Sequence, residues 1–257
     1  KGWDAPGFDD SKWTPAEVVS IDKALLRARL SVPVKIHERI KPIKLITSPK
    51  GEQILDFGQN MAGWVRIRSD APAGTEIKLQ FGEWLYPDNT FYNDNYRTAL
   101  AEEVYISDGT AREYVPSFTF YGFRFAKVEG LDTVNPDDFT AEVVHSQMER
   151  TGFFECSDER VNRLFLNALW GQKGNFVDVP TDCPQRDERM GWTGDAQVFC
   201  ATACMNMEAD AFYRKYLYDL KKEQSKHGYV PVVIPFFIYG SGRWDFPTAA
   251  WGDAATI

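Results

Sequence analysis

The chain has 257 residues, enough for one large domain or two ordinary ones, and a formal net charge of −8. Its charged residues are interspersed, so we expect no nucleic-acid partner, because binding to a phosphate backbone requires Lys and Arg clustered on one face. There is no run of about 18 apolar residues, so we expect no membrane-spanning helix, and no feature indicates a cellular compartment.

Residues 1–33 include Trp3 and Trp13 but too few apolar positions to bury a core. We interpret them as the tail of a preceding β-rich module. From residue 34 to residue 147, alternating apolar runs such as 64–68 and 76–81 are separated by the turn-rich segments 70–74, 87–89 and 107–109. Strands at this spacing, without helical periodicity, predict an antiparallel β-sandwich domain over residues 34–147.

The pattern becomes helical over residues 148–257. Ser157, Asp158 and Glu159 offer a cap and an acidic first turn, and apolar residues at helical spacing then predict about four turns. The polar segment 174–192 is expected to be a loop, and further helices are expected over 193–203 or beyond and over 209–222. The proline-rich stretch 229–235 is not expected to be helical, and another helix would begin near residue 251. This pattern indicates the N-terminal part of an all-helical catalytic domain.

Cysteine and histidine positions do not suggest a metal site. The cysteines form no CxxC pair, no histidine stands at zinc-ligand spacing, and we expect them to be buried and reduced. The three histidines are expected to be structural residues, isolated from one another. The residues concerned are Cys156, Cys183, Cys200, Cys204, His37, His145 and His227.

The densest chemical signal is the segment 182–195, DCPQRDERMGWTGD. Close carboxylates raise one another's pKa, as does burial beside an aromatic ring, so one carboxyl group can stay protonated as the general acid that glycoside hydrolysis needs. Arg186 and Arg189 can hold neighbouring carboxylates ionised, and Trp192 offers a flat face to a sugar ring. Asp195 lies in the first turn of a predicted helix, where the helix dipole favours its negative charge. It is therefore better placed to accept hydrogen bonds from sugar hydroxyl groups than to donate a proton. The alternative is a solvated loop of ion pairs.

This segment closely resembles the signature of the bacterial α-L-rhamnosidase family. Further similarity lies in DFGQNMAG at 56–63, FTFYGFR at 118–124 and WGDA at 251–254, so the resemblance covers nearly the whole chain. Met190 stands where the family more often has Leu, a volume-conserving exchange. The resemblance implies a β-sandwich followed by an (α/α)6 toroid of six helical hairpins, of which this chain would be an internal piece holding the first part.

The resemblance also implies an inverting glycosidase that removes terminal non-reducing α-L-rhamnose without a cofactor. Glu188 would be the general acid, and the first rhamnose subsite would include Asp182, Arg186, Trp192 and Asp195. The family's general base is a glutamate far downstream, about 6.5–9.5 Å from the acid in an inverting site. We therefore expect this chain to carry only the acid half of the site and to be inactive alone.

Other residues have two interpretations each. Trp244 and Trp251 could wall the sugar pocket, as tryptophans after this loop do in similar enzymes, or could pack between helices; we include Trp251 among the expected sugar contacts. Asp187 is expected to form an outward ion pair. The aromatic-rich segment 81–96 is expected to pack within and between domains in preference to stacking on sugars.

Two other functions remain open at this stage. One is a different glycosidase with the same toroid, which would keep Glu188 as the acid but act on another sugar. The other is a non-enzymatic carbohydrate-binding module in which the sandwich is the functional part.

Overall fold

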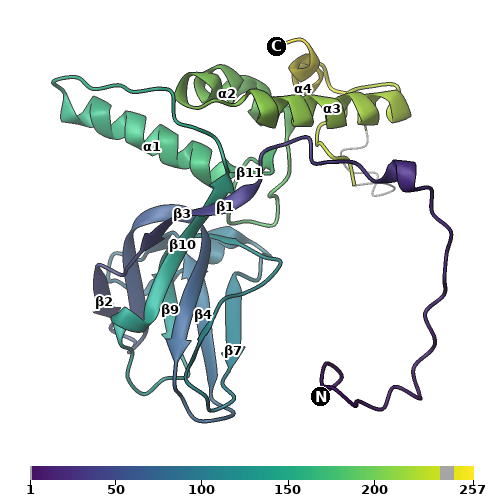
Figure 1. Ribbon diagram of the computed structural model, residues 1–257. Coiled ribbons are helices and arrows are strands. Elements are labelled where there is room, and N and C mark those ends of the chain that lie inside the picture. The colour runs from purple at the N-terminus through teal and green to yellow at the C-terminus, as the bar shows by residue number, and fades with distance from the viewer. Residues whose placement is uncertain (1, 238–245) are drawn as a thin grey trace.

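The computed structural model describes residues 2–237 and 246–257. A β domain lies beneath a layer of helices, and the N-terminal segment leaves this layer as an extended arm (Figure 1). The arm contains one short 3₁₀ helix, η1 (Lys23–Leu25), and residues 2–30 are exposed. The expectation that this segment builds no core of its own is confirmed.

The β domain is built on one antiparallel sheet with the strand order β1-β10-β3-β9-β4-β7, and β2 and β8 also pair with β3. The strands are β1 (Val34–Ile40), β2 (Lys44–Thr47), β3 (Gln53–Ser69), β4 (Glu76–Gly82), β7 (Glu102–Ile106), β8 (Arg112–Tyr114), β9 (Tyr121–Glu129) and β10 (Phe139–Ser146). A separate hairpin joins β5 (Trp84–Leu85) to β6 (Phe91–Tyr92). The predicted strands 64–68 and 76–81 lie within β3 and β4.

The sheet curls around its own core. Alternate side chains of each strand face inward, so Val65 and Ile67 are fully buried while Arg66, between them, lies on the opposite face. The expected antiparallel β architecture is therefore confirmed, with one curled sheet supplying the facing layers. Within the aromatic-rich segment, Tyr96 is buried as expected, but Trp84 is 69% exposed and does not pack in a core.

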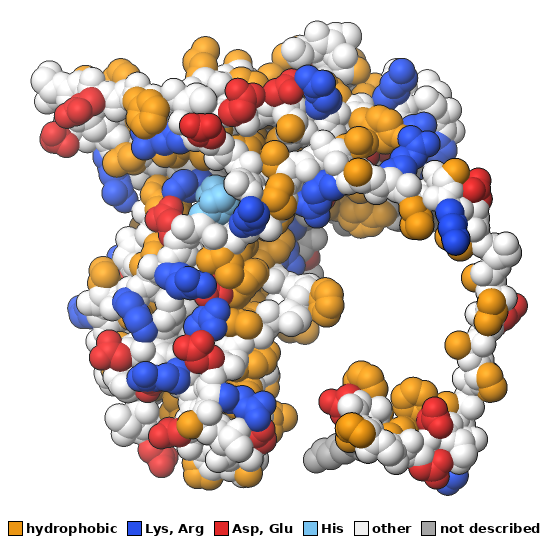
Figure 2. All heavy atoms as spheres, viewed as in Figure 1, with side chains coloured by type: hydrophobic (Ala, Val, Ile, Leu, Met, Phe, Trp, Pro, Cys, Tyr) orange, Lys and Arg blue, Asp and Glu red, His pale blue; other side chains and the backbone are white. Residues whose placement is uncertain are grey.

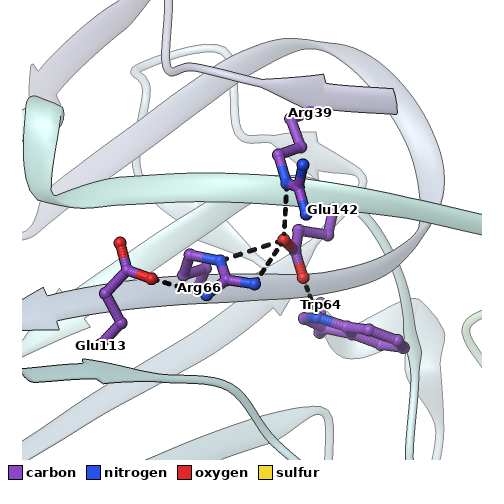
Figure 3. Close-up of polar contacts among 5 residues, drawn as sticks. All are labelled: Arg39, Trp64, Arg66, Glu113 and Glu142. Carbon is purple, nitrogen blue, oxygen red and sulfur yellow. Dashed lines mark hydrogen bonds and ion pairs between the residues drawn. The ribbon is translucent and has the colours of Figure 1, made fainter. Parts of the chain in front are cut away.

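On the face opposite the core, one buried carboxylate joins three strands (Figure 3). Oε1 of Glu142 accepts hydrogen bonds from Arg39 on β1 and Arg66 on β3, at 2.9 and 2.8 Å, and Oε2 accepts one from Trp64 at 2.8 Å. Arg66 also reaches Glu113. Burial alone would raise the pKa of Glu142, but these donors outweigh it and lower the pKa. Elsewhere on the visible face of the β domain, acidic and basic side chains are interspersed (Figure 2).

The prediction that the histidines are isolated was wrong for two of them. The rings of His37 and His145 stack with centroids 3.6 Å apart. The pairing of β1 with β10, in which Lys35 lies opposite His145, brings them together across more than a hundred residues. Burial lowers the pKa of His145 to about 4, so its ring is neutral at ordinary pH.

The helical part contains α1 (Glu159–Asn175), α2 (Thr193–Asn206), α3 (Asp210–His227), α4 (Ala249–Gly252) and the 3₁₀ helix η4 (Asp253–Ala255). The side chain of Asp158 accepts a hydrogen bond from the backbone N–H of Arg160, which confirms the expected cap of α1. The predicted helices are found, although α1 and α3 are longer than expected. None of the helices in the described part of the chain is long and apolar enough to cross a membrane.

Helix α1 contacts β3 and β10 with its C-terminal half, while its N-terminal half extends away from the sheet (Figure 1). Leu169 is accordingly buried and Leu164 is 67% exposed. All four cysteines are free thiols. Cys183 is buried as predicted, but Cys156 and Cys200 are only partly buried and Cys204 on α2 is exposed, so the prediction of buried cysteines was wrong for these three.

Candidate active site

The acidic segment is a loop held firmly at both ends. It follows the hairpin of β11 (Phe176–Val177) and β12 (Val179–Pro180), where the N–H of Thr181 donates to the carbonyl of Asn175 at 2.8 Å. At its other end, the N–H of Thr193 donates to Val232 and the N–H of Ile234 donates to Gly191. A Cβ at Gly191 would lie 2.2 Å from the carbonyl oxygen of Ile234, so this close approach requires glycine. Backbone hydrogen bonds therefore hold both ends of the loop that carries the carboxylates.

Each carboxylate oxygen of Glu188 contacts the guanidinium group of a different arginine. Arg97 Nη1 lies 2.6 Å from Oε1, and Arg186 Nη2 lies 2.8 Å from Oε2. The Glu188 side chain is 27% exposed. The hydrogen bond from Arg97, one from Asp182 and the charge of Arg186 lower the pKa of Glu188, and partial burial opposes them. In this arrangement Glu188 is held as a carboxylate.

Asp182 is the more buried partner of Glu188, with a side chain 10% exposed. Arg186 Nη2 lies 3.6 Å from Asp182 Oδ2, so the same guanidinium group faces both carboxyl groups. A carboxylate oxygen from each acid and the thiol of Cys183 all lie within 4.8 Å of one another. Burial, followed by the hydrogen bond to Glu188, raises the pKa of Asp182. These opposite shifts favour Asp182 over Glu188 as the protonated partner of the pair.

These same three donor atoms are also close enough together to hold a cation. Both oxygens of Glu188, however, already contact the guanidinium groups of Arg97 and Arg186. This arrangement favours a proton over a metal ion.

Two cavities meet at Asp182. One, of about 650 Å³, lies against α1 and α2 and is lined by Asp182, Asp195, Gln197 and Trp251. The other, of about 460 Å³, lies at the junction with the β domain and is lined by polar residues that include Asp182 and Arg186. Although Asp195 is exposed, packing around its carboxyl group and the charge of Glu188 raise its pKa. The first cavity is large enough for a sugar ring.

The remaining candidates lie around this centre. Trp192 directly precedes α2, half-buried, and pairs through its backbone with Val233. The ring of Trp251 packs on Gly194. Asp187 is exposed, as expected for an outward residue, but accepts a hydrogen bond from the Thr98 hydroxyl in place of the expected ion pair. Trp244 lies outside the described residues. Arg189 does not hold a carboxylate, since it donates to the carbonyl of Phe120 at 2.6 Å.

Sequence reasoning missed the contribution of the β domain to this site. Arg97 is 91 positions before Glu188 and stands in a turn that carries no catalytic motif. Glu83, hydrogen-bonded to Asn60 at 2.9 Å, lines the second cavity, and burial raises its pKa. Such contacts depend on how the two domains meet, which local sequence patterns do not encode.

Comparisons with known proteins identify the family. The model of the bacterial alpha-L-rhamnosidase concanavalin-like domain matches residues 46–145, and that of the bacterial alpha-L-rhamnosidase 6 hairpin glycosidase domain matches residues 149–257. The chain belongs to the bacterial α-L-rhamnosidase family. The two matches also confirm the expected order of a β domain followed by helices of the six-hairpin type.

Individual rhamnosidases agree with this assignment. An α-L-rhamnosidase from Alteromonas sp. (strain LOR) is 39% identical over 264 residues, covering 100% of this chain and 28% of the relative. One from Streptomyces avermitilis is 41% identical over 257 residues, covering 98% of this chain and 24% of the relative. The chain thus spans about a quarter of the length of these relatives.

Solved structures show the same similarity. The native α-L-rhamnosidase from Aspergillus terreus matches with a TM-score of 0.88 and 40% identity, covering 99% of this chain and 30% of that chain. The Streptomyces avermitilis α-L-rhamnosidase complexed with L-rhamnose matches with a TM-score of 0.86 and 40% identity, covering 98% and 24%.

Proposed function

We propose that the protein containing this chain hydrolyses terminal non-reducing α-L-rhamnose residues from rhamnosides, with inversion at the anomeric carbon and with Glu188 as the general acid. The observation that carries the proposal is the Asp182, Arg186 and Glu188 cluster beside a sugar-sized cavity in a chain of the rhamnosidase family. The solved complex of a relative with L-rhamnose supports the choice of sugar.

The sugar would occupy the cavity of about 650 Å³ between α1 and α2. Asp182 and Asp195 offer carboxyl oxygens to its hydroxyl groups, and Trp251 offers an apolar ring face to its C–H groups. Arg186 orients Asp182 and Glu188, because its guanidinium group faces both. Trp192 would complete this subsite at the start of α2.

The acid step uses the proton shared by Asp182 and Glu188. In the ligand-free arrangement the raised pKa of Asp182 and the lowered pKa of Glu188 favour Asp182 as the protonated partner. A bound rhamnoside would remove water from Glu188 and raise its pKa, so the proton would move to Glu188 and then to the glycosidic oxygen. That oxygen takes the electron pair of the breaking bond, and water supplies the hydroxyl group to the anomeric carbon. A second carboxylate must deprotonate the water, and we assign no described residue to that role.

The test compares the whole protein with its Glu188→Gln variant on an alkyl α-L-rhamnoside, whose leaving group needs a proton. We expect the variant to lose at least ~100-fold in kcat, because a positioned general acid contributes about 10²–10⁴-fold. Asp187→Asn is the matched control, since Asp187 is the adjacent exposed carboxylate and should keep near-normal turnover.

The same assay separates the other functions. Unchanged turnover in Glu188→Gln would contradict the assignment of the acid. Turnover of a different glycoside, with none of the rhamnoside, would indicate another six-hairpin glycosidase. Sugar binding without turnover, surviving both Glu188→Gln and Asp195→Asn, would indicate a binding module.

A further inference from the structure

Arg97, a residue of the β domain with an unusual backbone conformation, contacts the proposed acid Glu188. Arg97 follows the 3₁₀ helix η2 (Asp94–Tyr96) and has φ 61° and ψ −116°, a conformation that L-residues with side chains rarely adopt. Such positions persist when their surroundings hold them, and they cluster at functional sites. The fold therefore accepts local strain at the residue that contacts Glu188.

The turn that carries Arg97 is anchored on both sides. Tyr96, directly before it, is buried, and its hydroxyl donates to the carbonyl of Gly122 at 2.5 Å. The N–H of Arg97 donates to the carbonyl of Asp94, and the N–H of Ala99 donates to that of Tyr96. The Arg97 side chain is 52% exposed, so its backbone is fixed while its guanidinium group keeps access to solvent.

A simpler role for Arg97 would be to dock the two domains. Other contacts also hold this junction, because Thr98 bonds to Asp187 and Arg189 bonds to the carbonyl of Phe120. A Cβ on Gly122 would lie 2.8 Å from the ring of Pro184, which shows how closely the surfaces already fit. Partly exposed ion pairs add little stability, about 0–1 kcal/mol.

We propose that Arg97 is a positioning residue for Glu188, through which the β domain sets the orientation and proton affinity of the catalytic acid. The inference rests on the proposed function. When Glu188 gives its proton to the glycosidic oxygen, it becomes a carboxylate, and Arg97, 2.6 Å from Oε1, stabilises that charge as it forms. Before the sugar binds, the same contact lowers the pKa of Glu188 and favours its carboxylate form.

The effect of Arg97 on the pH profile has a definite sign. The acid step needs one proton on the pair of Asp182 and Glu188, so kcat/KM falls on the alkaline side as the free enzyme loses this shared proton. An adjacent cation lowers the pKa of a carboxyl group, and its removal raises that pKa. Replacing Arg97 with a neutral residue of similar length should therefore move the alkaline limb to higher pH, while loss of orientation lowers the maximal rate.

The experiment measures kcat/KM against pH for the whole protein and for Arg97→Met, Arg97→Lys and Thr98→Val, on an alkyl and a nitrophenyl α-L-rhamnoside. For Arg97→Met we expect the pH at which kcat/KM falls on the alkaline side to increase by about one unit. We also expect at least a ~10-fold loss with the alkyl substrate and a smaller loss with the nitrophenyl substrate, whose leaving group scarcely needs a proton. Arg97→Lys should restore much of the normal profile.

Thr98→Val is the matched control because it removes a neighbouring cross-domain hydrogen bond without touching Glu188. A docking role would make Arg97→Met and Thr98→Val alike, with unshifted limbs and equal losses on both substrates, and this result would overturn the inference. Glu188→Gln, measured alongside, tests the proposed function separately: if it keeps full activity, the proposed acid fails, whatever Arg97 does.

Discussion

Two adjacent glutamates on β7 have pKa values shifted in opposite directions because they lie on opposite faces of the sheet. Glu103 faces the core and is 2% exposed, and burial raises its pKa to about 8. Glu102 faces outward, where hydrogen bonds from Lys78 and Gln80 lower its pKa. Protonation of Glu103 is therefore favoured by folding, and ionisation of Glu102 is favoured by folding.

These opposite shifts predict opposite pH effects on stability. Between its ordinary pKa of 4.5 and about 8, the folded chain holds the Glu103 proton more tightly than the unfolded chain, so the free energy of unfolding falls as pH rises through this window. Glu103→Gln should remove this fall. Glu102→Gln, the matched control, should lose stability at neutral pH and approach the parent as pH falls through the lowered pKa of Glu102. Urea unfolding at pH 3, 5, 7 and 9 measures both; parallel curves for parent and Glu103→Gln between pH 5 and 9 would contradict the account.

At the scale of elements, glycine sets the distance between α2 and α4. A Cβ on Gly194 would lie 2.7 Å from the ring of Trp251, whereas a Cβ on Gly171, on α1 beside the same cavity, would meet nothing within 4 Å. Gly194→Ala should therefore displace Trp251 and destabilise the chain by about 1–3 kcal/mol. Gly171→Ala should be neutral or stabilise it by up to about 1 kcal/mol. Thermal unfolding compares the two, and an equal gain in both would show that Trp251 does not pack there.

The elements themselves could be predicted well from sequence. Period-two alternation located β3 and β4, and the acidic cap with its apolar spacing located α1. Burial along α1 could not be predicted, because only its C-terminal half contacts the sheet. The same limit explains the histidine error, since strand pairing brought His37 to His145.

For the whole molecule, the sequence motif predicted which loop carries the site but not what surrounds it. The fourteen-residue segment identified Asp182, Arg186 and Glu188, which the structure does bring together. Arg97 and Glu83 come from the β domain and were not predictable, because their roles arise only when the two domains meet. The raised pKa also fell on Asp182 and not on Glu188, since the two guanidinium groups surround Glu188.

The stereochemistry of hydrolysis tests the central claim most directly. Proton NMR spectra recorded during the first minutes after the whole protein is mixed with an α-L-rhamnoside identify the anomer first released, before mutarotation. We predict β-L-rhamnose as the initial product, and none above background from Glu188→Gln. Initial release of α-L-rhamnose, or no release of rhamnose by the parent protein, would contradict the account.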